Sequence, residues 1–591
     1  MSDDPFDDLG PETLGGDGPG GDGPGLPDDA VLAAQITEAA QLPLHDDGNG
    51  RRLALYFGED LMFVPRVGWF SWTGQVWAAD PDDIEVRRRS QQLAGLIWRE
   101  SAALRLTNWQ AHLVAEERRL RADMAAYEVI EGGALSPEAE AAVRGIEAEL
   151  RGVRDALKKS GDPRLAHRRF ALQTGNSGRM QAARGEAEVR LAVPVEALDA
   201  DGLAVNTRSG VLRFRVTTDD GFRRCEVVCD DHARADRMTK IVAARYDPDA
   251  ECPAFDAFFA RVVPDPEMRA FLLRWFGLSM LGVVEQKLAF LYGMGANGKS
   301  VLVDLMARIL ADYAATARIE SLTGTNRRGG GDATPDLVPL IGARMVRAAE
   351  PDEGVKWQEG LIKDLTGGEP ILVRALNKDF VTCRPVFSLT ISGNHKPDIR
   401  GTDDGIWRRL LLVPFEVQIP EAEQMPKAEL DATLFAEADG VFRRLVEAAA
   451  DYLERGLRPP DQVTQATQEF REESDPYGSF LHDACVVTSD AADTITSREL
   501  MLAFQFWQMS QGLGAFKDRT ISIGFRERSR RWVSRQGQRF TYRKSAGVSL
   551  YDGIRFTDLF ARVWAAAPKD SQGRALSVPA DVAREAGEGR G

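Results

Sequence analysis

The chain has 591 residues, of which 43% are hydrophobic, and its formal net charge is -16. This length allows three or four domains, and the sequence holds no run of about eighteen apolar residues that would form a membrane span. Its five cysteines include no CxxC pair, which argues against a disulfide framework or a structural zinc site. We therefore expect a multidomain intracellular protein with no membrane segment.

The first 48 residues are rich in Asp, Gly and Pro. Twelve acidic residues precede the first basic one, Arg51, and this composition predicts a disordered, solvating tail over residues 1–48. A short helix is expected within it, at about residues 30–42. The rest of the chain is then close to neutral, so local basic surfaces for DNA are compatible with the acidic total.

Residues 49–240 are expected to form an α+β domain. Two strands at 61–65 and 69–77 carry three tryptophans, which we assign to a small core in preference to stacking on bases. A helix over 84–100 follows. Alternating apolar residues then predict further strands at 188–193, 203–205 and 210–216.

A helical hairpin is predicted as an insertion in this domain, at residues 109–160. Its second helix has Ser136 as a cap and Pro137 in its first turn. The mixed charges favour a solvated surface, and a contact with another protein remains the alternative. Residues 241–285 are mostly helical and are expected to form a collar next to the following domain.

A phosphate-binding loop is predicted between a strand and a helix. Residues 288–292 form a short apolar run, typical of a strand buried on both faces, and 293–300 read GMGANGKS, which matches G-x-x-x-x-G-K-[ST]. Glycines let the backbone approach phosphate oxygens, and the following helix adds the positive end of its dipole. We expect Lys299 to contact the β- and γ-phosphates of ATP and Ser300 to ligate Mg²⁺. The other residues of the predicted nucleotide site are Gly293, Gly295, Ala296, Asn297, Gly298 and Val301.

An acidic residue is expected to complete the magnesium site. The apolar run at 344–349 ends in Glu350, where an acid would hold the magnesium sphere and orient the attacking water. Asp352 or Glu353 would support it.

Two more positions are candidates for acting on the γ-phosphate. Asn394 follows the apolar run 385–393 and would hold the attacking water. Arg408 and Arg409 precede another apolar run, and either could stabilise the transferring phosphoryl group from a neighbouring subunit. Of these two we favour Arg409.

A hairpin between these motifs is the candidate contact with DNA. Residues 371–374 and 380–383 can pair, with Lys378 at the tip. A lysine at a hairpin tip is usually only solvated, but in a ring it would point into the central channel and meet a phosphate backbone. Lys363 and Arg374 are assigned to the same contact.

The order of these segments resembles the superfamily 3 helicases, and more closely the helicase half of phage and plasmid primases and the poxvirus primase-helicase. The matching stretches are GKS at 298–300, AAE at 348–350, KDLTGGE at 363–369, GN at 393–394 and DDGIWRRLLLVPF at 403–415.

This resemblance implies an AAA+ P-loop ATPase assembled as a hexameric ring around DNA. It implies Lys299 and Ser300 on the nucleotide, Glu350 as the second-motif acid, Asn394 as a sensor and an arginine finger in trans. It also implies a phage or prophage protein in the cytoplasm of a bacterial host. One departure is the absence of a separate primase domain, because Asp199 and Asp201 are spaced as Asp-x-Asp but their setting predicts a turn.

The C-terminal part is expected to bind duplex DNA. After an ATPase domain over 286–420 and a helical extension over 421–470, residues 471–568 predict two helices and a hairpin, consistent with a winged helix. We expect residues 569–591 to be disordered. The basic residues that form the candidate DNA surface are Arg526, Arg528, Arg530, Arg531, Arg535, Arg539, Arg543 and Lys544.

The sequence therefore predicts a multidomain α/β protein with an AAA+ P-loop core, an α+β N-terminal domain and a winged-helix-like C-terminal domain. The favoured function is an ATP-dependent replicative DNA helicase acting as a ring. The alternatives are a primase-helicase that also makes primers, another P-loop DNA motor such as a packaging ATPase, and an origin-binding protein without catalytic activity.

Overall fold

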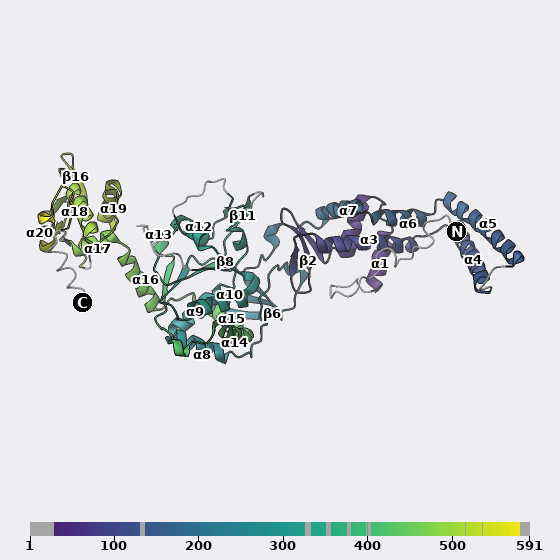
Figure 1. Ribbon diagram of the computed structural model, residues 1–591, viewed down its shortest axis with the longest axis horizontal. Helices are drawn as coiled ribbons and strands as arrows, with labels where there is room; N and C mark the ends of the chain where they lie inside the picture. The colour runs from purple at the N-terminus through teal and green to yellow at the C-terminus, as the bar shows by residue number, and fades with distance from the viewer. Residues whose placement is uncertain are drawn as a thin grey trace. The chain divides into compact units, whose positions relative to one another are not determined.

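The computed structural model describes residues 29–130, 136–324, 333–349, 356–374, 380–397, 399, 404–514, 516–534 and 536–578. It is a mixed α/β chain with two compact units (Figure 1). Unit 1 comprises Met1–Phe214 and Val227–Val242, and unit 2 comprises Arg215–Glu226 and Ala243–Gly591. Of the helices in these described ranges, none combines the length and the hydropathy needed to cross a bilayer.

Unit 1 begins with helices around a three-stranded antiparallel sheet of order β1-β2-β3. Its elements are α1 (Asp29–Ala39), α2 (Asp46–Phe57), β1 (Leu61–Val64), β2 (Gly68–Trp72), β3 (Trp77–Asp80), α3 (Ile84–Ala103), α4 (Asn108–Ile130), α5 (Pro137–Lys159), α6 (Pro163–Thr174), α7 (Ser177–Arg190) and β4 (Ala204–Thr207). Trp69, Trp72 and Trp77 are buried, which confirms their prediction as core residues.

The disordered tail is shorter than predicted, because residues 29–48 are largely helical. Within this stretch, α1 confirms the short helix expected at about residues 30–42. Leu32 of α1 is buried in the unit 1 core. The fully buried guanidinium of Arg52 donates to the carbonyls of Ala39, Leu42 and Pro43 at 2.9 to 3.1 Å. These bonds hold the segment between α1 and α2 in place, and amino-acid composition alone does not predict them.

The strand predicted at 188–193 is also wrong, because α7 runs to Arg190. Ala183 and Ala187 are fully buried and let this helix approach α2, where a Cβ on Gly50 would lie 2.4 Å from the Glu186 Cβ. Val189 is 78% exposed, so the alternation that suggested a strand included an apolar side chain on the solvent side of a helix.

The predicted helical hairpin is present as α4 and α5, and residues 131–135 between these helices lie outside the described residues. Ser136 accepts from the Ala139 N–H at 3.2 Å, and Pro137 occupies the first turn, as predicted. The next sheet has the order β4-β5-β6 and includes β5 (Gly210–Asp219) and β6 (Phe222–Asp230).

Unit 2 is built on a five-stranded parallel sheet of order β13-β7-β12-β9-β8. Its elements are α8 (Pro253–Val262), α9 (Pro266–Leu278), β7 (Leu288–Tyr292), α10 (Lys299–Leu310), β8 (Ala314–Ala317), α11 (Ile319–Leu322), β9 (Met345–Ala348), α12 (Glu359–Gly367), β10 (Ile371–Val373), β11 (Val381–Cys383), β12 (Ser388–Gly393), α13 (Asp404–Trp407), β13 (Leu410–Pro414), α14 (Lys427–Ala436), α15 (Ala438–Arg455) and α16 (Asp461–Glu473).

The central strands of this sheet are buried, as continuous apolar runs predict for parallel strands. The segment expected as a collar, 241–285, contains α8 and α9. The Trp275 indole of α9 donates to the Thr390 hydroxyl of β12 at 2.8 Å, so α9 covers the sheet directly.

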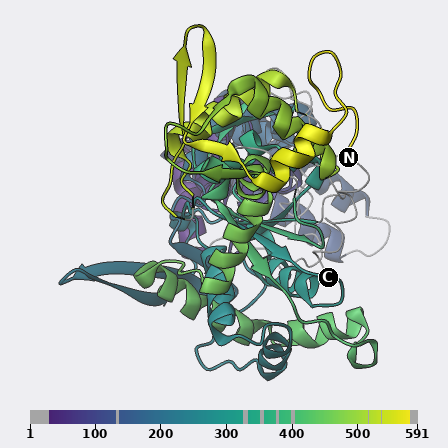
Figure 2. The same cartoon turned by 90° about the vertical axis from the view of Figure 1, so that its left-hand side faces the viewer.

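The C-terminal part of unit 2 contains α17 (Pro476–Asp483), β14 (Cys485–Val487), β15 (Thr494–Thr496), α18 (Ser497–Ser510), α19 (Asp518–Arg531), β16 (Thr541–Ser545), β17 (Val548–Asp552), β18 (Ile554–Phe556) and α20 (Asp558–Ala566). Phe480 and Phe504 lie at the centre of an aromatic core. Figure 2 shows the β16–β17 hairpin extending beyond the helices of this part. Residues up to 578 are ordered, contrary to the tail predicted from 569, because Ala575 and Val578 pack on the same core.

Candidate nucleotide-binding site

The glycine loop lies where parallel strands end. Tyr292 closes β7, which has β13 on one side and β12 on the other, and Lys299 opens α10. In the registers of these strands, Gly393 and Pro414 both pair with Tyr292. The residues that follow three neighbouring strands therefore emerge at one edge of the sheet, which is where α/β proteins bind ligands.

The loop is held by the segment that follows β13. The Asn297 side-chain amide donates to the Phe415 carbonyl at 3.2 Å, and the Ile419 N–H donates to the Ala296 carbonyl at 2.9 Å. A Cβ on Gly293 would lie 2.2 Å from the Phe415 oxygen, so a larger residue cannot be accommodated there without moving the backbone.

Lys299 joins the loop to the neighbouring strand. Its side chain is 4% exposed, and its ammonium donates to the Gly293 carbonyl at 2.6 Å and to the Asn297 Oδ1 at 3.0 Å. It also donates to the Asn394 Oδ1 at 3.3 Å, directly after β12. Two residues that are 95 positions apart in the sequence, and that were predicted separately, are thus in contact.

The remaining loop residues are open to solvent on one side. Gly295, Ala296 and Ser300 are exposed, and Val301 is half-buried. Backbone N–H groups, a lysine and a hydroxyl at the start of a helix are a donor set that fits a phosphate chain and its magnesium ion. Glu350, Asp352 and Glu353 lie outside the described residues, although β9 ends at Ala348 in the same sheet.

The two candidate arginine fingers differ in exposure. Arg409 is 7% exposed, and its guanidinium donates to the Gly405 carbonyl at 2.7 Å. Arg408 is exposed. A residue that reaches the nucleotide of a neighbouring subunit must extend from its own subunit. The burial of Arg409 therefore weighs against the preference for it, and Arg408 is the more accessible of the two candidates.

The predicted hairpin forms from β10 and β11, which pair in antiparallel register. Its tip, including Lys378, lies outside the described residues. The Arg374 guanidinium lies 5.2 Å from the Phe380 ring centre, and Lys363 is half-buried on α12. The assignment of these two cations to DNA stays a prediction.

Sequence patterns missed the support that α8 gives to the loop. Gly298 has a φ of 79°, and a Cβ there would lie 2.6 Å from the Val262 Cγ1 and 3.3 Å from the Phe258 Cζ. These apolar side chains belong to the predicted collar. Because they carry no chemistry of their own, no motif identifies them.

The Asp-x-Asp pair has a structural role in unit 1. The Asp199 carboxylate accepts from the Thr239 N–H at 2.8 Å. Asp201 accepts from the Leu203 N–H at 2.9 Å and lies 3.5 Å from Arg213. Both residues precede β4 rather than lying on it, so the pair belongs to a turn, as predicted.

The C-terminal basic residues are only partly available to a ligand. Arg528 forms an ion pair with Asp475, and Arg543 forms one with Asp552, while Arg535 lies outside the described residues. Arg530 and Arg531 are exposed at the end of α19. The prediction that the cluster acts as one surface is therefore too broad.

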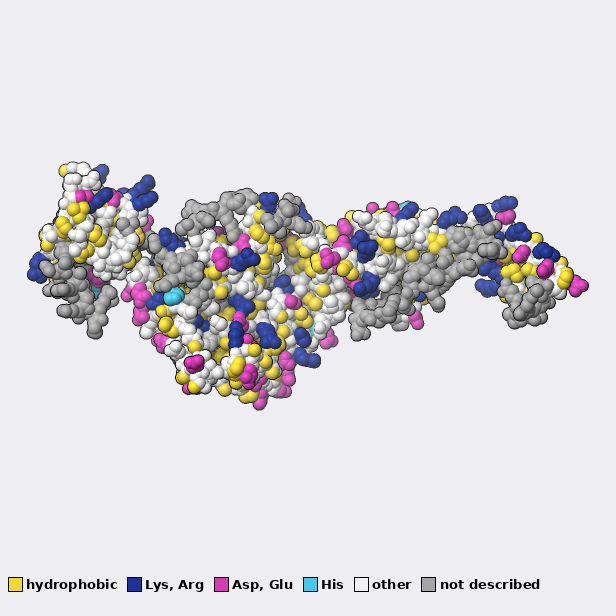
Figure 3. Space-filling view, in the orientation of Figure 1, with side chains coloured by type: hydrophobic (Ala, Val, Ile, Leu, Met, Phe, Trp, Pro, Cys, Tyr) yellow, Lys and Arg dark blue, Asp and Glu magenta, His cyan; other side chains and the backbone are white. Residues whose placement is uncertain are grey.

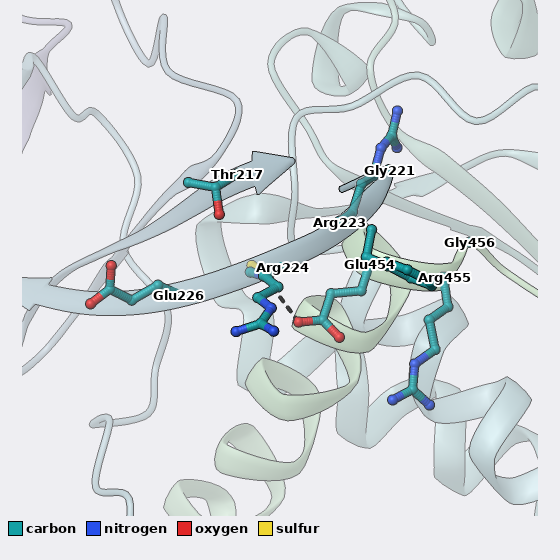
Figure 4. A pocket seen from close by; sticks show the side chains of 10 residues that line it. Thr217, Gly221, Arg223, Arg224, Glu226, Glu454, Arg455 and Gly456 are labelled. Carbon is teal, nitrogen blue, oxygen red and sulfur yellow. Dashed lines mark hydrogen bonds between the residues drawn. The ribbon is translucent and has the colours of Figure 1, made fainter. Parts of the chain in front are cut away.

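An open pocket of about 1150 Å³ shares no residue with the loop (Figure 4). It lies between the β5–β6 turn and the C-terminal end of α15, and the Cys225 N–H donates to the Glu454 carboxylate across it at 2.9 Å. Its walls combine arginines with glutamates: Arg223, Arg224, Arg455, Glu226 and Glu454. Because the walls carry both positive and negative side chains, the pocket does not favour an anion such as phosphate.

Two parts of the chain match known families. Residues 50–264 match the D5 N-terminal-like family, and residues 291–409 match a family of unknown function, DUF5906. The second match begins inside β7 and ends at Arg409, so it contains the glycine loop and Asn394.

Several viral proteins are related to this chain. A protein of Acanthamoeba polyphaga mimivirus named as a candidate helicase is 30% identical over 275 residues, which cover 44% of this chain and 28% of that protein. A similarly named protein of Frog virus 3 is 29% identical over 268 residues, covering 42% of this chain and 27% of that protein. A candidate primase of African swine fever virus is 23% identical over 150 residues, covering 25% and 16%.

The chain thus spans less than a third of the length of these curated relatives. Among solved structures, the C-terminal region of NrS-1 is 14% identical, and the alignment covers 57% of this chain and 82% of that one with a TM-score of 0.34.

Proposed function

Since this chain is a relative of the D5-like viral primase-helicases, we propose that it is an ATP-dependent DNA helicase with an AAA+ core of superfamily 3 type. In this proposal it acts in replication as a hexameric ring, in the cytoplasm of the bacterial host of a phage or prophage. Residues 286–420 form the ATPase domain, and the flanking domains position DNA.

One observation carries the proposal: the contact between Lys299 and Asn394 at the carboxyl edge of the parallel sheet. The loop from β7 supplies the phosphate-binding backbone and the lysine. The neighbouring strand β12 supplies an amide 3.3 Å from that lysine. A phosphate-binding loop with a polar sensor on the next strand is an arrangement that can bind a triphosphate and respond to its hydrolysis.

The residues fit ATP and Mg²⁺. The exposed Ser300 hydroxyl and the proposed acid Glu350 would hold the metal, which supplies charge neutralisation on the β- and γ-phosphates when bound. When ATP binds, the Lys299 ammonium would donate to phosphate oxygens in place of the loop carbonyls. Gly293 and Gly298 let the loop pack closely on the Phe415 carbonyl and on Val262, and Gly295 leaves the open side of the loop without a side chain. Ala296, Asn297 and Val301 complete the loop.

The remaining site residues act between subunits or on DNA. Arg408, which is exposed directly after α13, would stabilise the transferring phosphoryl group in the adjacent subunit. Lys378, with Lys363 and Arg374 on neighbouring elements, would contact single-stranded DNA in the ring channel. Arg530 and Arg531 at the end of α19 would contact the phosphates of duplex DNA.

The test is DNA-stimulated ATP hydrolysis and fork unwinding by the wild type and by Lys299→Ala. We expect the variant to fold and to lose both activities, because a phosphate-binding cation that no other side chain replaces is removed. The circular dichroism spectrum controls for folding. Unwinding by Lys299→Ala at the wild-type rate would refute the proposal.

A mixing experiment tests the shared site. Arg408→Ala and Lys299→Ala should each be inactive alone, and mixed rings should regain part of the activity, since some interfaces then carry an intact loop facing an intact arginine. Arg409→Ala is the matched comparison: it removes a buried guanidinium, so we expect it to lower stability and not to complement.

A primase-helicase that also synthesises primers is the second candidate, because one relative is named as a candidate primase. The contacts of Asp199 and Asp201 argue against these residues as its metal ligands. Incorporation of labelled ribonucleotides on a single-stranded template measures this activity directly.

A further inference from the structure

A second pocket lies at the start of the C-terminal part of unit 2, and no sequence motif predicted it. Its volume of about 620 Å³ is within the range of about 300–1000 Å³ that is usual for ligand sites. None of its described lining residues belongs to the glycine loop or to the pocket in Figure 4. We call it the aromatic pocket, because its walls include the rings of Trp407, Tyr477, Trp507, Phe516 and Trp532.

Two rings of the wall keep part of their surface accessible. Phe516 and Trp532 are both half-buried. The Trp532 ring centre lies 6.1 Å from that of Phe540, with an interplanar angle of 59°. The Phe516 ring centre lies 5.9 Å from that of Tyr477, at 45°. These tilted contacts hold the two rings in place without stacking face to face, so a planar ligand ring can stack on them.

One polar side chain in the wall has an unused acceptor. Gln508 is 1% exposed, and its Nε2 donates to the Gly514 carbonyl at 3.2 Å. Because a carbonyl oxygen only accepts, this bond identifies which end of the amide is the nitrogen. The Gln508 Oε1 is buried and has no hydrogen-bond partner among the residues that the structure describes. A buried acceptor in this state costs free energy that a donor would restore.

The missing partner of Gln508 is therefore an N–H or O–H group of a ligand. Gln508 follows Trp507 on α18, and both residues line the aromatic pocket. The terminal torsion of a glutamine side chain is soft, so the oxygen can turn toward a donor that enters the pocket. A ligand with a planar ring and a donor on its edge would satisfy the amide and the aromatic wall together.

Charge does not select the ligand of this pocket. The charged residues of the described wall have both signs: Arg471, Arg528, Glu472, Glu473 and Asp475. Asp475 pairs with Arg528 inside the wall. Glu473 pairs with Lys396 at 2.6 Å. The rings and the amide are thus the features that distinguish one ligand from another, and they favour an uncharged aromatic ring.

The aromatic pocket adjoins exposed cations at the end of α19. Arg530 and Arg531 lie in the sequence between the wall residues Arg528 and Trp532, and both are exposed. Arg531 also lies 3.8 Å from Glu527 of the same helix. Figure 3 shows Lys and Arg side chains gathered over α19. A nucleotide whose base enters the pocket would have guanidinium groups for its phosphate within one helical turn of the wall.

We propose that the aromatic pocket binds a nucleobase with an exocyclic amino group, such as adenine or cytosine. Base rings stack on aromatic side chains whatever their sequence, and the amino group is the donor that the Gln508 oxygen lacks. Thymine presents carbonyl oxygens instead and leaves this acceptor unpaired. An unpaired base of a DNA strand and a free nucleoside share this chemistry. The inference goes beyond the proposed function, because ATP hydrolysis does not require such a site.

The experiment measures binding of labelled single strands to the full chain without ATP, by fluorescence anisotropy. The strands are oligodeoxyadenylate and oligothymidylate of about twelve nucleotides. Trp532→Leu should weaken the binding of both strands by about 5- to 150-fold, because a stacking surface is lost. Gln508→Met should weaken only the adenine strand, by about 2- to 12-fold, so the ratio of the two affinities falls by that factor.

Adenosine, titrated by calorimetry, distinguishes the two sources of the base. If adenosine binds the wild type and both test variants lose this binding, the pocket accepts a free nucleoside. If only the strands bind, and they depend on the same two side chains, the base comes from unpaired DNA. Either result supports a nucleobase site.

The matched control is Trp109→Leu. Trp109 is 55% exposed on α4 of unit 1, so the control removes an accessible indole from another surface. We expect it to bind every probe as the wild type does. Thermal unfolding controls for folding: Gln508→Met should leave the Tm unchanged or raise it, because it removes an unpartnered acceptor, and the exposed Gly514 carbonyl can bond to water.

Three results would overturn the inference: a wild type that binds neither strand nor adenosine, a Trp532→Leu variant that cannot be distinguished from Trp109→Leu, or a Gln508→Met variant that binds the adenine strand and adenosine as the wild type within a factor of two. If Trp532→Leu fails to fold, Gln508→Met decides alone. Because no ATP is present, these outcomes are distinct from a failure of Lys299→Ala to abolish hydrolysis.

Discussion

Replacing Gly298 by alanine should damage the phosphate loop through its packing on α8. Gly298 has a φ of 79°, and an alanine held in the left-handed region costs roughly 1–2 kcal/mol. Its Cβ would lie 2.6 Å from the Val262 Cγ1, and overpacking of this kind costs about 1–3 kcal/mol. We expect a total loss of about 2–5 kcal/mol in the free energy of unfolding.

Gly295 provides the matched control in the same loop. A Cβ at this position would have no neighbouring atom within 4 Å, and the φ of Gly295 is outside the left-handed region. Gly295→Ala should therefore change the free energy of unfolding by less than about 1 kcal/mol. The assay is thermal unfolding of the full chain without nucleotide, so that phosphate contacts do not enter.

For a unit of about 360 residues, a loss of about 3 kcal/mol lowers the Tm by about 4 °C. Equal Tm values for Gly298→Ala and Gly295→Ala would refute the reasoning, because they would show that α8 does not limit the space behind the loop. A fall in ATP hydrolysis by Gly298→Ala at a temperature where both variants are folded would show that loop geometry matters beyond stability.

Two further predictions concern the buried charges of unit 1. Both oxygens of the Glu100 carboxylate accept from the Arg52 Nε, at 2.9 and 3.0 Å, and both side chains are fully buried. Glu100→Gln should therefore lower the free energy of unfolding, measured by urea denaturation, by about 3–5 kcal/mol. A loss below about 1 kcal/mol would contradict this expectation. Burial lowers the pKa of His167, although the Glu100 carboxylate lies 3.7 Å away and acts in the opposite direction. Protons therefore bind preferentially to the unfolded chain. The contribution of neutral His167 to stability is present above about pH 6.5 and is lost as the pH falls. The wild type should therefore lose more stability than His167→Gln between about pH 7.5 and about pH 5.5, and parallel losses would exclude this role.

The elements of unit 2 were predictable because their local patterns agree with their environment. The residues of β7 are continuously apolar and the strand is buried on both faces. The glycine loop and the start of α10 follow within eight residues, so a contiguous motif describes them. The order of the strands in the sheet was not predictable in the same way, because it is set by crossovers that no local pattern encodes.

Neighbouring residues with the same chemistry were not distinguishable. Arg408 and Arg409 are adjacent and chemically identical, and the burial of Arg409 depends on the turn between α13 and β13, where its N–H donates to the Ile406 carbonyl. The same limit applied at the N-terminus, where the guanidinium of Arg52 orders a segment whose composition predicts disorder.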